Sequence, residues 1–129
     1  MKKIPEKKRF SIIHRLGSTN HAWRGLGIFF KTGHNLWVQL FFAISAVYLG
    51  FALHISNIEW VLIIFVIGLV IIAEAFNTAI EIDIDLTSPT YHPYARDTKD
   101  VAAAAVLLSA LVSLVVGGII FIPKILLLF

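Results

Sequence analysis

The chain has 129 residues, of which 58% are hydrophobic and only 15% are charged. This length predicts one domain. The apolar excess excludes an ordinary soluble protein. It predicts a small all-α protein that crosses a membrane several times. The net charge of +3 does not indicate nucleic-acid binding, because most lysines and arginines lie before residue 32. Basic residues clustered before a first span are typical of its cytoplasmic side and of contacts with anionic lipid. The absence of cysteine excludes disulfides and thiolate metal sites.

Residues 1–35 are predicted to form a charged tail followed by an amphipathic helix on the cytoplasmic surface. Apolar residues follow one helical face at intervals of three and four, at Trp23, Leu26 and Phe30. Basic residues on the other faces make this pattern typical of a helix that lies on a membrane. A break at Gly17 is one alternative, and a soluble juxtamembrane helix without a ligand is another.

Residues 36–129 are predicted to form a membrane domain with three spans. Each span is close to the ~20 residues that cross hydrocarbon as a helix; the spans are 36–53, 60–80 and 101–122. The short connection 54–59 makes the first two spans a tight hairpin. Residues 83–100 are predicted to be an inner loop, because Pro89 and Pro93 prevent a continuous helix. The N-terminus is therefore expected inside and the C-terminus outside, and so thin a bundle is expected to self-associate.

Four polar residues interrupt the inner end of the second span, at intervals of three, four and four: Glu74, Asn77, Glu81 and Asp85. At about 100° per residue, their side chains fall within roughly 80° of one helix face. A carboxylate in hydrocarbon costs about 3 kcal/mol or more, so this face is expected to meet protein or water. Glu74, the deepest, is predicted to be a general base. The lower carboxylates are predicted to bind Mg²⁺, which prefers hard oxygen ligands, whereas Asp83 lies off this face.

Lys99 and Asp100 directly precede the third span. Lys99 is predicted to neutralise a nucleotide phosphate, with a snorkelling anchor as the alternative. Asp100 is able to cap the span by accepting hydrogen bonds from free N–H groups. The chain has no Walker loop and no glycine-rich strand-to-helix turn. Any phosphate binding must therefore use a carboxylate-held metal and basic side chains.

These residues resemble the motifs of the prokaryotic diacylglycerol kinase family, which includes the undecaprenol kinases. The motif Glu-x-x-Asn-Thr/Ser-Ala-Ile-Glu-x-x-x-Asp stands here at 74–85. A second block matches Tyr91-His92-Pro93 and Thr98-Lys99-Asp100. In the surface helix, a Ser-x-x-x-Ala-x-x-Gly-Ile/Leu pattern matches Ser18, Ala22, Gly25 and Leu26.

The resemblance implies an ATP- and Mg²⁺-dependent lipid kinase of the bacterial inner membrane, built as a homotrimer with active sites shared between subunits at the cytoplasmic face. It implies that Glu74 is the base acting on the lipid hydroxyl and that Glu81 binds Mg²⁺. The residues it implies for positioning substrate and nucleotide are Gly25, Asn77, Asp85, Lys99 and Asp100. The second block favours undecaprenol as the acceptor, with diacylglycerol as the alternative.

Two positions depart from the family pattern. Where these kinases usually carry a glutamate as a further metal ligand, this chain has Gly33, and His21 replaces a tyrosine. The missing carboxylate keeps a catalytically inactive membrane scaffold as an alternative. A proton or cation conduit is another, since buried carboxylates in a small bundle often serve ion movement. The lack of acidic residues in the outer halves of the spans argues against a conduit.

Overall fold

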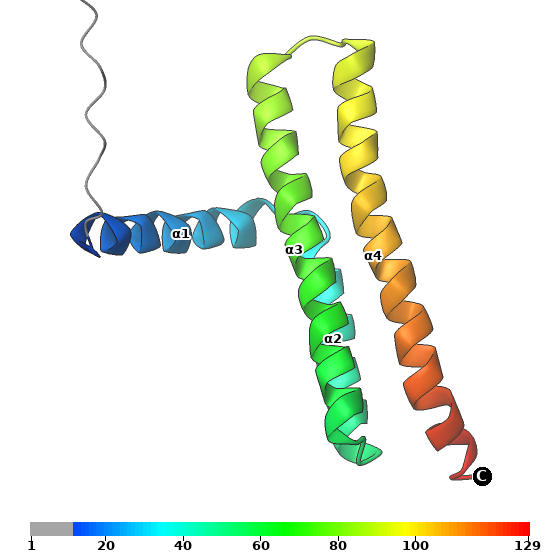
Figure 1. The fold of residues 1–129 in the computed structure, drawn as a ribbon. Coiled ribbons are helices and arrows are strands. Elements are labelled where there is room, and N and C mark those ends of the chain that lie inside the picture. Colours follow the sequence, from blue (N-terminus) through cyan, green and yellow to red (C-terminus); the bar gives the residue numbers. More distant parts are fainter. Residues whose placement is uncertain (1–11) are drawn as a thin grey trace, which may run out of the picture. The chain divides into compact units, whose positions relative to one another are not determined.

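The computed structural model describes residues 12–129, with side chains from Thr19 onward. This part of the chain contains four α-helices and no strand, which confirms the all-helical class. The helices are α1 (Ile12–Thr32), α2 (Leu36–Ala52), α3 (Asn57–Thr87) and α4 (Pro93–Leu126) (Figure 1). The chain divides into two compact units, one ending at Lys31 and the other formed by Thr32–Phe129.

The helix α1 is continuous from Ile12 to Thr32, so the break considered at Gly17 does not occur. A single glycine costs a helix interior only about 1 kcal/mol relative to alanine, which is not enough to end it. Trp23, Leu26 and Phe30 are exposed on this helix. The contact of their face with a membrane surface stays a prediction.

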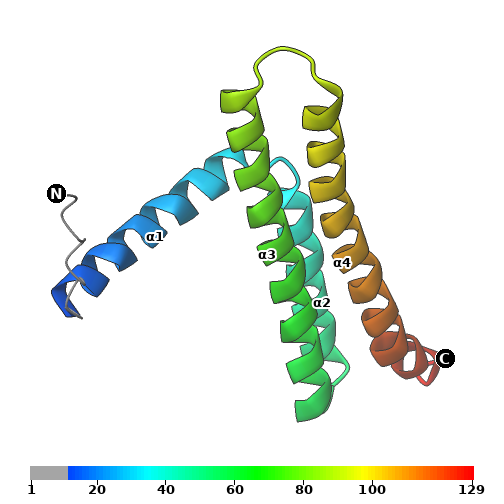
Figure 2. The same ribbon diagram turned by 45° about the horizontal axis from the view of Figure 1, so that its top comes forward.

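Two helices of the larger unit, α3 and α4, are long and apolar enough to cross a membrane. They lie side by side as an antiparallel pair, with α2 against α3 (Figure 2). With 17 residues, α2 is at the lower limit of about 17 for a spanning helix. The structure therefore supports a membrane protein with two to three spans.

The helices α2 and α3 form the tight hairpin predicted from the short connection. Residues 53–56 link them, and His54 adopts a left-handed backbone conformation with φ of 47°, a region in which histidine is enriched. A capping box starts α3: the Glu59 N–H donates to Ser56 Oγ at 3.3 Å, and the Ser56 N–H donates to Glu59 Oε2 at 2.7 Å. Lys124 of α4 lies 3.2 Å from the same carboxylate and ties α4 to this end.

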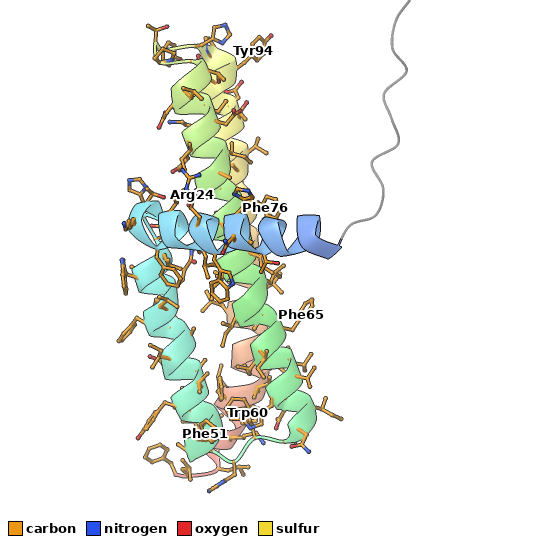
Figure 3. The ribbon with its side chains drawn as sticks, turned by 90° about the vertical axis from the view of Figure 1, so that its left-hand side faces the viewer. Arg24, Phe51, Trp60, Phe65, Phe76 and Tyr94 are labelled. Atoms are coloured by element: carbon orange, nitrogen blue, oxygen red, sulfur yellow. The ribbon has the colours of Figure 1, made fainter. Side chains whose placement is uncertain are left out.

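Gly50 allows the hairpin to close on Trp60. A Cβ added at Gly50 would lie 2.7 Å from Trp60 Cη2 and 3.1 Å from Ile55 Cδ1. The Trp60 ring also packs on Phe51, with ring centroids 4.8 Å apart (Figure 3). Trp60 is thus part of the packing between α2 and α3, close to the core cluster of Ile55, Ile63, Ile120 and Phe121.

The substitution Gly50→Ala should lower the free energy of unfolding by about 1–3 kcal/mol, because an added methyl group overpacks the site. Gly68→Ala is the matched control, since a Cβ there meets nothing within 4 Å. It should raise stability by up to about 1 kcal/mol, because alanine is the better helix former. Thermal unfolding followed by circular dichroism in detergent checks both, and equal shifts in the two variants would contradict this account of Gly50.

The connection between α3 and α4 is shorter than the loop predicted at 83–100. Both helices extend into that segment, leaving only 88–92 between them, so the prediction was wrong. Pro93 takes the first helical position of α4, where its missing N–H leaves no hydrogen bond unmade. His92 caps α4, with its Nδ1 accepting from the Tyr94 N–H at 3.3 Å. Asp100 therefore lies inside α4, and its predicted role as the cap is also wrong.

The helix α4 does not stop at Pro123 but continues to Leu126, with the proline inside its last turns. The two long helices thus extend beyond the apolar segments 60–80 and 101–122 that mark them in the sequence. At the end opposite the hairpin, these extensions carry charged residues on both helices.

Candidate active site

Glu74 is the most enclosed charged side chain of α3, with only 1% of its surface exposed. Both of its carboxylate oxygens accept hydrogen bonds from the start of α2. The Asn35 backbone N–H donates to Oε1 at 3.3 Å, and Gln39 Nε2 donates to Oε2 at 3.0 Å. Each oxygen retains a further lone pair. The carboxylate is therefore held in one orientation while it stays able to take a proton.

Asn77 and Glu81 follow on the next turns of the same face. Asn77 is buried, and its Nδ2 donates to Glu81 Oε1 at 3.1 Å. Asn77 Oδ1 is also buried and has no hydrogen-bond partner among the described residues. The second oxygen of Glu81 lies 3.7 Å from His34 Nδ1. The amide of Asn77 thus orients the carboxylate predicted to bind metal, and an unused amide oxygen lies close to it.

Asp85 and Lys99 form an ion pair that joins α3 to α4 just inside the connection 88–92. On α4, Arg96 lies 3.6 Å from Asp100, one helical turn away. Arg96, Lys99 and Asp100 line a hollow of about 290 Å³ at this end of the molecule. The hollow is therefore lined by two cationic side chains and one carboxylate, and each cation is paired with an aspartate. A nucleotide phosphate would have to share these cations with the two aspartates.

A metal ion needs more ligands than the protein alone gathers here. Among the described residues, no three histidine, aspartate or glutamate side chains are close enough to hold a metal together. Mg²⁺ usually binds one or two carboxylates and completes its shell with phosphate oxygens and water. Glu81 fits as the single carboxylate, and the unpartnered Asn77 Oδ1 on the adjacent turn is a second hard oxygen.

The structure brings most of the predicted site residues together, but not all of them. Glu74, Asn77 and Glu81 share one face of α3, and Asp85 meets Lys99. Gly25 lies in α1, where an added Cβ would meet nothing within 4 Å. Its predicted role in positioning substrate stays a prediction.

Three residues at this end of the molecule were not predicted from the sequence: Asn35, Gln39 and Arg96. Gln39 is a polar residue in an otherwise apolar segment, a pattern that often marks a buried contact. Arg96 precedes Lys99 by three residues, which places both on one face of a helix once α4 is known to begin at Pro93. For Asn35 no sequence pattern points to the contact, because the backbone N–H makes it.

Comparison with known proteins identifies the family. The family described as prokaryotic diacylglycerol kinase matches residues 20–121. The chain is 38% identical over 104 residues to the undecaprenol kinase of Bacillus subtilis, covering 81% of this chain and 85% of that protein. It is 36% identical over 112 residues to the diacylglycerol kinase of Synechocystis sp., covering 86% of this chain and 64% of that protein. It is 30% identical over 115 residues to the diacylglycerol kinase of Haemophilus influenzae, covering 88% and 98%.

The match at 20–121 includes every predicted site residue from Gly25 to Asp100. The relatives are named as kinases of lipid alcohols, so they are phosphotransferases with an alcohol group as acceptor. The two helices that are long and apolar enough to cross a membrane are consistent with a kinase whose acceptor is a membrane lipid. The chain belongs to the prokaryotic diacylglycerol kinase family and is a membrane lipid kinase.

Proposed function

We propose that this kinase transfers the γ-phosphoryl group of ATP to the hydroxyl group of undecaprenol at the cytoplasmic face of the bacterial inner membrane. The undecaprenol kinase of Bacillus subtilis, 38% identical over 85% of its length, supports this acceptor. Diacylglycerol is the second candidate, since relatives in Synechocystis sp. and Haemophilus influenzae carry that name. The N-terminus is proposed to lie inside and the C-terminus outside.

The enclosed and doubly hydrogen-bonded Glu74 carries the proposal. The lipid hydroxyl oxygen forms a bond to the γ-phosphorus as the bond to the β–γ bridging oxygen breaks and ADP leaves. Glu74 accepts the hydroxyl proton as general base. Because Asn35, the residue that caps α2, and Gln39 within α2 hold its carboxylate, little reorganisation is needed to reach a productive geometry.

Glu81 is the proposed Mg²⁺ ligand, with Asn77 orienting it and Asn77 Oδ1 available on the adjacent turn. When bound, the metal neutralises charge on the transferring phosphates. From α4, Lys99 and Arg96 would contact phosphate oxygens. Asp85 holds Lys99 in place through their ion pair, and Asp100 does the same for Arg96.

A homotrimer with active sites shared between neighbouring subunits is part of the proposal. Three helices bury little apolar surface, and many large side chains on α2, α3 and α4 stay exposed in the single chain. Within a membrane, apolar side chains that the single chain leaves exposed contact either lipid or a helix of another subunit. Small residues such as those at 102–105 and 117–118 permit close helix contacts in membranes.

The test is a radiolabelled ATP assay on the purified protein in mixed micelles, with undecaprenol and diacylglycerol offered separately. We expect transfer to both alcohols to depend on Mg²⁺ and to be faster with undecaprenol. Faster transfer to diacylglycerol would overturn the choice of acceptor. No transfer to either alcohol by protein with intact helix content would favour an inactive scaffold, and proton or cation flux in liposomes would favour a conduit.

Gly33 offers a direct test of the metal site. It is buried and precedes His34, whose Nδ1 lies 3.7 Å from Glu81. Gly33→Glu adds the carboxylate that the family resemblance leads one to expect. It should lower the Mg²⁺ concentration for half-maximal transfer by on the order of tenfold, since even outer-shell partners of metal ligands change affinity that much.

The control is Gly33→Gln, which has a similar shape and no charge. Gly33 lies in the connection between α1 and α2, and both changes add a side chain at this buried position, so helix content is measured for each. If glutamate and glutamine shift the Mg²⁺ requirement equally, the added charge does not reach the metal site and its assignment near Glu81 is wrong.

A further inference from the structure

His34 lies beside the carboxylate proposed to bind the metal, and the mechanism above gives it no role. It follows Gly33 in the connection between α1 and α2, and its Nδ1 lies 3.7 Å from Glu81 Oε2. The imidazole is 83% exposed, so little of the ring packs against the rest of the chain. The side chain of Glu81 is 31% exposed, so an ion can reach both groups from solvent. The contact with Glu81 is therefore where a role of His34 would lie.

The distance between these two side chains suits a shared metal ion. Ligand atoms about 2.1 Å from one ion lie roughly 3.0 Å apart at a right angle and about 3.4 Å apart at a tetrahedral angle. The separation of 3.7 Å between His34 Nδ1 and Glu81 Oε2 is slightly longer than the second value. It is also too long for a direct hydrogen bond. A small rotation of the exposed imidazole would bring both atoms onto one ion.

A buried amide oxygen adds a third donor atom next to Glu81. Asn77 is 5% exposed, and its Nδ2 donates to Glu81 Oε1 at 3.1 Å. The oxygen of the same amide, Asn77 Oδ1, is buried and finds no hydrogen-bond partner in the part of the chain that the structure describes. A buried acceptor without a partner is costly, and a cation bound beside Glu81 would satisfy it.

These three donor atoms are of two chemical kinds, which bears on the metal that binds. Carboxylate and amide oxygens suit both Mg²⁺ and Mn²⁺, whereas an imidazole nitrogen is a ligand typical of transition metals. Mg²⁺ gains little from a nitrogen ligand, because it prefers hard oxygen donors. Two oxygens and one nitrogen therefore favour a divalent transition-metal ion over Mg²⁺.

We propose that His34 binds the metal ion held by Glu81, and that its nitrogen makes the site prefer a divalent transition metal such as Mn²⁺ to Mg²⁺. This inference rests on the metal site of the proposed function. His34 directly follows Gly33, the position where the family resemblance leads one to expect a carboxylate. The chain thus has a nitrogen donor one residue after the missing oxygen donor. Phosphate oxygens and water complete the coordination shell.

Mn²⁺ is the probe, because its unpaired electrons couple to a directly bound nitrogen. The purified protein carries ¹⁵N-labelled histidine and is mixed in micelles with Mn²⁺ and the β,γ-methylene analogue of ATP, which cannot transfer its phosphoryl group. Pulsed EPR should show ¹⁵N coupling in the parent and lose it in His34→Ala. Nitrogens of the nucleotide do not contribute, because only histidine carries the label. A parent protein without ¹⁵N coupling would overturn the proposal.

His54→Asn is the matched control for the loss of one histidine. His54 is exposed in the connection at the hairpin end, and asparagine also suits its left-handed backbone. This variant should keep the parental ¹⁵N coupling. Loss of the coupling in His54→Asn but not in His34→Ala would assign the bound nitrogen to the wrong end of the unit and overturn the proposal.

Displacement of Mn²⁺ by Mg²⁺, followed by the EPR signal of free Mn²⁺, measures the preference between the two ions. His34→Ala should weaken Mn²⁺ binding by roughly tenfold or more and Mg²⁺ binding much less. The ratio of the two affinities should therefore move toward Mg²⁺. An equal loss for both ions would mean that His34 only orients Glu81, and the nitrogen ligand would be wrong.

The EPR measurements do not depend on turnover, so they separate this inference from the proposed function. Coupling to His34 without phosphoryl transfer in the presence of either metal would support the metal site and overturn the kinase mechanism. Phosphoryl transfer that requires Glu81, in a parent without ¹⁵N coupling, would overturn the role of His34 alone.

Discussion

Glu74→Gln should lower the rate of phosphoryl transfer by roughly 10²–10⁴-fold, the usual contribution of a general base. The amide keeps the shape of the side chain but cannot take the hydroxyl proton. The surroundings of Glu74 can accept the change, because Gln39 has an unpartnered Oε1. If the Gln39 amide turns over, this oxygen accepts a hydrogen bond from the new amide nitrogen. We therefore expect helix content, oligomeric state and ATP binding to be unchanged.

The measurement is kcat at saturating ATP and lipid alcohol, with nucleotide binding followed separately. Asp83→Asn is the matched control, since Asp83 is an exposed carboxylate of the same helix that lies off the polar face. It should keep parental activity. Near-normal turnover of Glu74→Gln would remove Glu74 from the mechanism. If Asp83→Asn lowers the rate of transfer as much as Glu74→Gln does, the rate depends on the net charge of α3 and not on Glu74 as a base.

Glu81→Ala should raise the Mg²⁺ concentration for half-maximal transfer by at least 10- to 100-fold, because loss of even a metal ligand's outer partners has that effect. This variant also leaves Asn77 Nδ2 without its acceptor, which by itself disturbs a buried amide. Glu81→Gln separates the two effects. It retains an oxygen that can accept from Asn77 but loses the charge that attracts the metal.

Titration of activity with Mg²⁺ at fixed ATP compares the two variants with the parent. If Glu81 binds the metal, both substitutions should raise the Mg²⁺ requirement. Protein stability should be lowered mainly by Glu81→Ala. If Glu81→Gln titrates like the parent, Glu81 serves only to hold Asn77, and the metal must bind elsewhere.

The polar face of α3 could be predicted from sequence because helical periodicity fixes the angle at which each side chain leaves the axis. The cost of a carboxylate in hydrocarbon further predicted that Glu74 would be enclosed. Periodicity does not say which helix covers that face, however. The contacts from Asn35 and Gln39 arise from packing between segments 35 and 39 residues apart, and no local pattern encodes them.

The error at 83–100 has a local cause. Proline inside a segment predicts a break in the helix, whereas Pro93 starts α4 and His92 caps it. Once both helices extend past the membrane segments, Asp85 and Lys99 face each other across a short turn instead of lying in a loose loop. Asp100 then becomes a side chain on a helical face beside Arg96, so its environment differs from that of a cap.

The unequal distribution of packing along α2–α4 divides the unit mechanically. At the hairpin end, Trp60 seats against Gly50 beside the core cluster, and Lys124 holds Glu59. At the other end, an exposed ion pair between Asp85 and Lys99 joins the tips of α3 and α4, and such pairs contribute little and weaken with salt. The helices α3 and α4 are therefore held firmly at the hairpin end and only weakly at the opposite end. The site proposed for the nucleotide therefore lies at the end of the unit where α3 and α4 are held together least strongly.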